Sequence, residues 1–414
     1  MILAQHIYIR HTTRAHRFFH SSIHRMANMT NAKYFPVLKV TIYVLLLCAA
    51  IVPVMYRGVT VKPFPDFVVD TVTALDATPA NQKVNYACED CLVPSVHGAN
   101  VIEKLDGDLL ATWFGGSREG GKDVVLWGAD YSVSSQTWTS PRRIVGPAET
   151  QAALGRYIKT VGNSVLVRGE HDVLWLYYVT VSVGGWAGSS LNVMLSQDDG
   201  KSWNTPRRLI TSPFVNISTL NKSAAIHYAD GSIGLPVYHE FIGKFAELLR
   251  LDNAGNVLSK MRITHGRHAI QPLLLPLNIQ QALALMRDTG PSPGHVLISR
   301  SLDAGQHWST DEKLTLPNPD SAVAGLRRPD GSLLLVYNDT EAGRSSLALA
   351  ISTDEGASWR TVKHFEQGSG STGEFSYPYL IRAHNGTMHL LYTWNRKRIR
   401  HISFNDHWVD GVKP

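Results

Sequence analysis

Short apolar runs follow turn residues at regular intervals along most of the chain. They are rich in Val, Leu, Tyr and Trp, and six of them follow turns that begin at Asp106, Glu170, Asp230, Asn278, Asp330 and Asn385. Such runs, bounded by turn residues, indicate β-strands. Helical periodicity is weak by comparison, and residues 240–251 are the main segment with some helical character. The pattern predicts an all-β chain.

A second repeat, Ser-x-Asp-x-Gly-x-x-Trp, is out of phase with the first. Its three copies span Ser196–Trp203, Ser301–Trp308 and Ser352–Trp359, and weaker copies lie before Trp138 and around 253–258. The Asp can cap backbone N–H groups of a hairpin turn, the Gly can adopt a positive φ, and the Trp can cover the hairpin. We interpret these residues as structural, in preference to catalytic or metal-binding.

Both repeats recur about every 50 residues, which is the length of a four-stranded propeller blade. The sequence therefore predicts a six-bladed β-propeller, with a pair of β-sandwiches as the alternative. Ligands of a propeller bind near its axis, so a site should consist of isolated polar residues, one or two from each blade.

An uncharged apolar run, Val40–Tyr56, lies between Lys39 and Arg57. Its length suits a membrane-spanning helix, and the basic stretch before it favours a cytoplasmic N-terminus. We expect a basic cytoplasmic tail at 1–39, a transmembrane signal anchor at 40–57, a linker at 58–88 and the propeller at 89–414. The propeller would then lie outside the cytoplasm, periplasmic or extracellular. A cleaved signal peptide is the alternative.

The charge of the chain is uneven. There are 40 Lys and Arg against 34 Asp and Glu, a net charge of +6, and the surplus lies before residue 40 at Arg10, Arg14, Arg17, Arg25, Lys33 and Lys39. A nucleic-acid partner is therefore not expected, because a folded nucleic-acid-binding domain carries its own basic surplus. Cys88 and Cys91 indicate either a local disulfide or two free thiols. No cofactor or metal motif occurs, and the sequence does not indicate an oligomeric state.

Polar residues at blade spacing form the candidate site. They are His97, Arg118, Asp123, Glu240, Gln271, Arg287, Arg344, Glu374 and Tyr377. Arginines that converge from different blades favour an anionic ligand, since guanidinium groups bind carboxylates in a bidentate manner. Arg396, Arg398 and Arg400 alternate along one strand, and for these three we favour a solvated strand face.

The Ser-x-Asp-x-Gly-x-x-Trp boxes, the six units and the segment Trp113–Gly120 (WFGGSREG) resemble sialidases (neuraminidases), in particular bacterial predicted neuraminidases, over about residues 90–410. The resemblance implies that Arg118, Arg287 and Arg344 bind an acidic sugar, that Asp123 is the acid/base and that Tyr377 is the nucleophile. Two positions depart from the family pattern. His97 lies about where the first clamp arginine is expected, and Gln271 lies where a Glu should activate the tyrosine.

The resemblance implies an exo-acting, sialidase-like glycoside hydrolase that removes an acidic terminal sugar from a glycan. A phenol is protonated at neutral pH, so attack by Tyr377 needs a base, and Glu374, Glu240 or His97 could serve. One alternative is a lyase acting on a uronate, with His97 as base, Tyr377 as acid, and Gln271 with the arginines neutralising the carboxylate. The other alternative is a propeller that binds glycans without catalysis.

Overall fold

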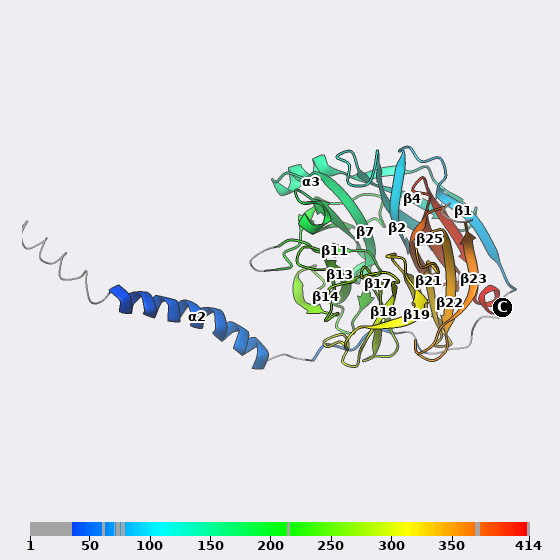
Figure 1. The fold of residues 1–414 in the computed structure, drawn as a ribbon. Coiled ribbons are helices and arrows are strands. Elements are labelled where there is room, and N and C mark those ends of the chain that lie inside the picture. The colour runs from blue at the N-terminus through cyan, green and yellow to red at the C-terminus, as the bar shows by residue number, and fades with distance from the viewer. Residues whose placement is uncertain are drawn as a thin grey trace, which may run out of the picture. The chain divides into compact units, whose positions relative to one another are not determined.

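The computed structural model describes residues 35–59, 63–69, 71, 75, 79–212, 216–368 and 373–411. The chain divides into two units, Met1–Pro63 and Phe64–Pro414. Over the described residues of the second unit the strands form six sheets of four or five strands, which follow one another around a central axis as a six-bladed β-propeller (Figure 1). The predicted architecture of this part of the chain is confirmed.

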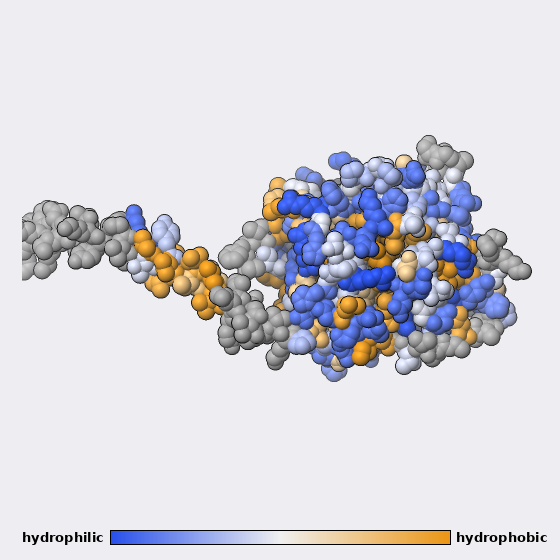
Figure 2. All heavy atoms as spheres, turned by 60° about the horizontal axis from the view of Figure 1, so that its bottom comes forward, coloured by the Kyte–Doolittle hydropathy of each residue, from blue (hydrophilic) through white to orange (hydrophobic). Residues whose placement is uncertain are grey.

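The first unit contains one described helix, α2 (Phe35–Val59), 25 residues long, which includes the apolar run. Its described side chains are exposed and largely apolar, with Val40 and Leu45 about 60% exposed (Figure 2). Among the residues that the structure describes, no helix reaches the combination of length and apolarity taken as the mark of a membrane span. The anchor at 40–57 stays a prediction, and residues 1–34 of the expected tail lie outside the described residues.

The first three blades run in chain order. Blade 1 consists of β2 (Ser95–Glu103), β3 (Leu109–Gly116), β4 (Val125–Ser132), β5 (Thr137–Trp138) and β6 (Arg142–Val145). Blade 2 consists of β7 (Thr160–Arg168), β8 (Leu174–Val181), β9 (Ser189–Ser196) and β10 (Arg207–Arg208). Blade 3 consists of β11 (Leu220–Asn221), β12 (Ile226–His227), β13 (Ile233–His239), β14 (Phe245–Leu251) and β15 (Val257–Arg262).

The other three blades complete the ring. Blade 4 consists of β16 (Ala269–Pro276), β17 (Ala282–Asp288), β18 (His295–Ser301) and β19 (Glu312–Pro317). Blade 5 consists of β20 (Ala324–Arg327), β21 (Leu333–Tyr337), β22 (Ser346–Ser352) and β23 (Arg360–Gln367). Blade 6 consists of β24 (Phe375–Arg382), β25 (Met388–Trp394), β26 (Arg398–Phe404) and β1 (Gln82–Cys88). Short helices in the connections and at the C-terminal end are α3 (Pro147–Leu154), η1 (Glu170–Asp172), η2 (Gly185–Gly188) and α4 (Asp406–Asp410).

The ring closes through β1, which pairs antiparallel with β26, so that the first and last strands of the propeller lie side by side (Figure 1). This corrects the linker expected at 58–88, because β1 is part of the last blade. Phe67, in the same segment, is buried against Tyr228 of blade 3, with their ring centroids 5.3 Å apart. Because β1 comes from the start of the propeller and β26 from its end, this pairing ties the two ends of the ring together.

A second correction concerns residues 240–251, where the sequence suggested helical character. The structure has β14 (Phe245–Leu251) there, a middle strand of blade 3 that is largely buried. A strand covered on both faces is apolar almost throughout, and so loses the alternation that distinguishes strands from helices.

The three Ser-x-Asp-x-Gly-x-x-Trp boxes are turns that follow β9, β18 and β22, as predicted. In the first box, Asp198 Oδ1 accepts hydrogen bonds from the Ser202 backbone N–H at 2.8 Å and the Ser196 hydroxyl at 2.7 Å. Gly200 has φ of +87°, and a Cβ there would lie 2.3 Å from a Leu110 side-chain atom of blade 1. The glycine thus allows each turn both its conformation and its close contact with the preceding blade.

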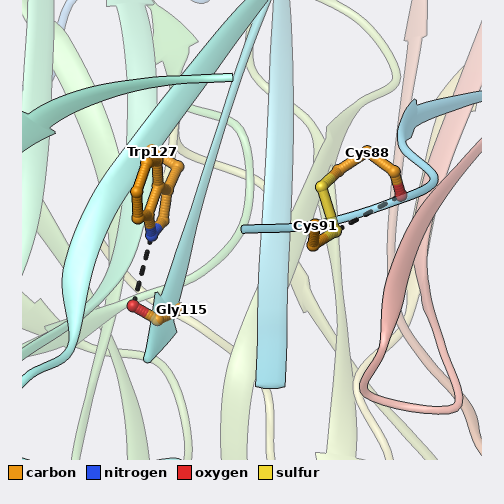
Figure 3. The surroundings of a disulfide bond; sticks show 4 residues. All are labelled: Cys88, Cys91, Gly115 and Trp127. Carbon is orange, nitrogen blue, oxygen red and sulfur yellow. Dashed lines mark hydrogen bonds between the residues drawn. A yellow bond between two sulfur atoms is a disulfide. The ribbon is translucent and has the colours of Figure 1, made fainter. Parts of the chain in front are cut away.

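Cys88 and Cys91 form a disulfide, which confirms one of the two interpretations of this pair (Figure 3). It closes a local loop between β1 and β2. In the neighbouring blade 1, the Trp127 indole N–H donates to the Gly115 carbonyl at 3.2 Å. The disulfide therefore lies in the connection from β1 of blade 6 to β2 of blade 1.

Candidate functional site

Four inner strands bulge at the same level of the propeller. The register shifts lie between His97 and Asn100 in β2, Gly162 and Ser164 in β7, Ile270 and Leu273 in β16, and Ser376 and Tyr379 in β24. Gln271 and Tyr377 occupy two of these bulges with positive φ values of 54° and 55°. A bulge re-aims a side chain out of the pleat. Local backbone distortion thus presents polar side chains of several blades at one place.

These residues surround a pocket of about 180 Å³. All six blades contribute to its lining. Blade 5 contributes through the loop after β21 and not through a strand. The lining residues are His97, Glu119, Asn163, Val179, Trp186, Leu220, Tyr238, Glu240, Lys244, Ile270, Arg287, Arg344, Tyr377 and Arg396. Five of the nine residues expected from the sequence lie in this lining: His97, Glu240, Arg287, Arg344 and Tyr377.

The Tyr377 hydroxyl is the centre of a hydrogen-bond network. It accepts from Gln271 Nε2 at 3.1 Å and from Arg287 Nη1 at 3.5 Å. Gln271 is itself buried, and its Oε1 accepts from Arg287 Nη1 at 3.2 Å. The same amide donates to the Tyr238 hydroxyl at 3.3 Å. Gln271 therefore joins the site as a hydrogen-bonding partner of the tyrosine.

Arg287 and Arg344 approach the tyrosine from blades 4 and 5. Arg287 Nε donates to Asp320 Oδ1 at 2.6 Å, and Arg344 Nη2 donates to the Asp320 carbonyl at 2.8 Å. The Arg344 guanidinium lies 6.0 Å from the centroid of the Tyr377 ring. Burial, with Arg287 close by, lowers the pKa of Arg344. Two guanidinium groups thus share one small volume, an arrangement that an anion would stabilise.

Arg396 also lines the pocket, which corrects its assignment to a solvated strand face. It lies in the turn between β25 and β26, and its Nε donates to Glu374 Oε2 at 2.7 Å while Nη1 donates to Glu119. Glu374 Oε1 is 3.6 Å from Arg344 Nη1. Burial lowers the pKa of Arg396, but the two carboxylates outweigh it and raise the pKa. Glu374 therefore lies between two arginines.

His97 is 2% exposed, and neither ring nitrogen has a hydrogen-bond partner in the part of the chain that the structure describes. Its ring centroid lies 4.2 Å from that of Tyr377. Burial, followed by the charges of Arg396, Arg344 and Arg287, lowers the pKa of His97 well below its ordinary value. His97 is therefore a neutral imidazole beside the tyrosine, with its polar atoms unpaired.

Glu240 follows β13 directly and is half-buried. Its backbone N–H donates to the Ser218 hydroxyl at 2.8 Å. Burial raises the pKa of Glu240, although Lys244 and Arg287 oppose the shift. Its carboxyl group makes no ion pair among the described residues.

The structure does not bring Asp123 and Arg118 into the pocket lining. Both are exposed on the loop between β3 and β4. Asp123 accepts hydrogen bonds from the Ser117 backbone N–H at 2.7 Å and from its hydroxyl at 2.8 Å. These bonds lower the pKa of Asp123, whereas an acid catalyst needs a raised pKa.

The pocket lining also contains residues that were not expected from the sequence: Asn163, Trp186, Tyr238 and Lys244. Alternation along a strand offered one signal, because Tyr238 and Glu240 are two residues apart and so share a face. Asn163 and Trp186 had no comparable signal, since one occupies a bulge and the other a loop helix. Within the described ranges no group of three or more His, Cys, Asp or Glu side chains could hold a metal ion.

The family model described as "BNR repeat-like domain" matches residues 107–390. A curated sialidase from Micromonospora viridifaciens is 25% identical over 347 residues, which cover 74% of this chain and 51% of the relative. The chain therefore spans about half the length of the curated relative.

Two solved structures share the fold. The Hadza microbial sialidase Hz136 superposes with a TM-score of 0.62 at 17% identity, covering 75% of this chain and 66% of the other. The intramolecular trans-sialidase from Ruminococcus gnavus has a TM-score of 0.62 at 12% identity, covering 80% of this chain and 99% of the other. At these identities the likeness concerns the fold alone.

Proposed function

The chain belongs to the sialidase-like BNR-repeat family, and on that premise we propose that its axial pocket is the active site of an exo-acting glycoside hydrolase that removes an acidic terminal sugar from a glycan. One observation carries the proposal: the Tyr377 hydroxyl is fixed by Gln271 and Arg287 in a pocket that Arg344 also enters. A nucleophile held beside two guanidinium groups suits a substrate that carries its own carboxylate.

In this reaction Tyr377 attacks the anomeric carbon and forms a covalent glycosyl-enzyme, which water then hydrolyses. A phenol is a suitable nucleophile here, because a carboxylate would repel the acid group of the sugar. Arg287 and Arg344 bind that acid group and orient the ring. The two hydrogen bonds donated to the tyrosine oxygen stabilise the negative charge that it carries as nucleophile and as leaving group.

The test is release of a fluorogenic aglycone from 4-methylumbelliferyl α-sialoside by the full chain. The wild type should release it, and Tyr377→Phe should abolish release, because the ring keeps its packing and loses the reacting oxygen. A matched control is Tyr157→Phe, since Tyr157 is an exposed tyrosine outside the pocket. Full activity in Tyr377→Phe would exclude this mechanism.

A second candidate function is supported by His97, whose unpaired neutral ring lies beside Tyr377. On a uronate, His97 would take the proton from C5, the C4–O bond would break with formation of a C4=C5 double bond, and Tyr377 would protonate the departing oxygen. Gln271 and the arginines would neutralise the carboxylate.

Incubation with uronate oligosaccharides separates the candidates. A gain in ultraviolet absorbance, from the unsaturated product, supports elimination, and release of free acidic sugar without that gain supports hydrolysis. Binding of either glycan with no product supports a propeller that binds without catalysis.

A further inference from the structure

We propose that Glu240, in place of Asp123, protonates the leaving-group oxygen, an inference that rests on the proposed hydrolysis. Glu240 directly follows β13, a strand of blade 3, and the end of that strand fixes the position of its backbone. The N–H of Glu240 donates to Ser218, whose side chain is fully buried. Glu240 therefore belongs to a well-supported segment and lines the same pocket as Tyr377.

The ion pairs around the pocket distinguish Glu240 from the other acids. Glu119 and Glu374 bind Arg396, and Asp320 binds Arg287. A carboxylate held by a guanidinium group is stabilised in its ionised form and is a poor proton donor. Among the described residues that line the pocket, Glu240 alone is an acid without an ion pair.

Charge balance points the same way. The pocket region contains four cationic groups, Arg287, Arg344, Arg396 and Lys244, and four acids, Glu119, Glu240, Glu374 and Asp320. The substrate carboxylate and the Tyr377 phenolate each add one negative charge, and protonation of one acid removes one of the two. Glu240 is the acid at which protonation breaks no ion pair, and burial already raises its pKa.

Asp123 has the opposite environment. It is exposed, its two oxygens accept hydrogen bonds from Ser117, and it lies outside the pocket lining. Protonation there would break bonds that order the loop. Glu240, in the pocket, is therefore better placed to donate a proton than Asp123, which the family resemblance indicated.

In the reactive form Tyr377 is a phenolate and Glu240 is protonated. Tyr377 forms a bond to the anomeric carbon while the glycosidic C–O bond breaks, and the Glu240 proton passes to the departing oxygen. Ionised Glu240 then takes a proton from water as the water oxygen bonds to the anomeric carbon and Tyr377 leaves. Both residues return to their starting states, and the sum is hydrolysis.

The experiment compares two leaving groups. Sialyllactose leaves as a sugar alkoxide and needs protonation, whereas 4-methylumbelliferone is a stable phenolate and needs little. Glu240→Gln should lower kcat/KM for sialyllactose by about 100-fold or more and for the aryl sialoside by less than about 10-fold. Glu312→Gln is the matched control, because Glu312 is an exposed residue of β19 away from the pocket, and both substrates should be turned over normally.

Two further measurements guard against a merely structural effect. Azide should accelerate turnover of the aryl sialoside by Glu240→Ala and yield glycosyl azide, because the small anion needs no base. In addition, the alkaline limb of the sialyllactose kcat profile should be lost in Glu240→Gln, since the wild-type limb reports loss of the acid's proton.

Equal losses on both substrates in Glu240→Gln, or a leaving-group-dependent loss in Asp123→Asn instead, would overturn the assignment. Failure of the wild type to release sugar from either substrate is a different result, and it overturns the proposed hydrolysis together with this inference.

Discussion

The box turns and the axial pocket both contain acidic side chains near backbone with positive φ, yet their acids are in opposite states. In the first box, Asp198 accepts hydrogen bonds from Ser196 and Ser202, and these bonds lower its pKa to about 2. In the pocket, Glu240 has no ion pair among the described residues, and burial raises its pKa.

The difference separates two uses of polar groups. The box satisfies its aspartate within one turn, so its bonds contribute to folding and leave nothing for a ligand. The pocket leaves the His97 ring nitrogens without a hydrogen-bond partner among the described residues and brings arginines together. Neither feature stabilises the fold. Substitutions in the pocket should therefore change turnover more than folding, and substitutions in the box should do the reverse.

The largest effect is expected for Arg287→Met. Turnover of the aryl sialoside should fall by about 100-fold or more, because the substrate anion and the tyrosine oxygen both lose a charged donor. The free energy of unfolding should change by less than about 1 kcal/mol, since Asp320 remains half-exposed and water replaces its partner. Urea denaturation measures the second quantity. A loss of several kcal/mol with modest loss of turnover would contradict the comparison.

A buried pair of histidines tests polar groups that are buried and only partly hydrogen-bonded, since His389 Nε2 has no partner among the described residues. His389 Nδ1 and His401 Nε2 are 3.0 Å apart, and the Trp138 indole N–H donates to His401 Nδ1 at 3.2 Å. Burial lowers the pKa of His389 to about 4. The unfolded chain binds a proton near pH 6.5 and the folded chain does not, so stability is lost as the pH falls below that value.

From His389 alone the loss should reach about 2 kcal/mol at pH 5 relative to pH 7. Urea denaturation at these two pH values measures it. The difference between the two should shrink in His389→Leu, and an unchanged difference would assign the pH dependence to other groups, including His97.

Lys222 is a second buried polar group whose hydrogen bonds are expected to contribute to stability. It is 5% exposed, its amino group donates to the carbonyls of Val323 at 3.2 Å and of Pro378, and burial lowers its pKa to about 7. Lys222→Met should lower the free energy of unfolding by about 1.5 kcal/mol, because two buried carbonyls lose their donor. Lys201→Met, at an exposed lysine, should have no such effect. Equal stability of the two variants would show that these bonds contribute nothing.

The smallest effect is expected for a substitution in the second box turn, Ser301–Trp308. Asp303 accepts from the His307 backbone N–H at 2.8 Å and from the Ser301 hydroxyl at 3.0 Å. Asp303→Ala should cost about 1 kcal/mol of stability, as loss of a similar cap does, with no change in turnover. Glu341→Ala, at an exposed acid, is the control for urea denaturation. Lost turnover at unchanged stability would give the box a role in the site.

The sequence predicted the parts that repeat. The blades, the box turns and the residues at the ends of inner strands recur at a fixed spacing, and so Gln271, Arg287 and Tyr377 could be found. Arg396 was wrongly assigned to a solvated strand face because it lies in a turn, where alternation along the strand does not decide which way a side chain points. Asp123 lies outside the pocket lining, and the conformation of its loop depends on Ser117 and not on any period.

The clasp strand β1 was missed because it is an outermost strand. Its first three residues are exposed, so its sequence has no strong apolar run, and its partner β26 lies at the other end of the chain. Local patterns contain no information about such a pairing.

The closure of blade 6 by β1 has a consequence for synthesis. β1 leaves the ribosome before any other strand of the propeller, and its partner β26 leaves after all the others. Blades 1 to 5 can pair their own strands as they emerge, but the last blade cannot be completed until β26 has emerged. Tyr377 and Arg396 belong to that blade, so a nascent chain that stops before β26 has an open ring and an unfinished pocket.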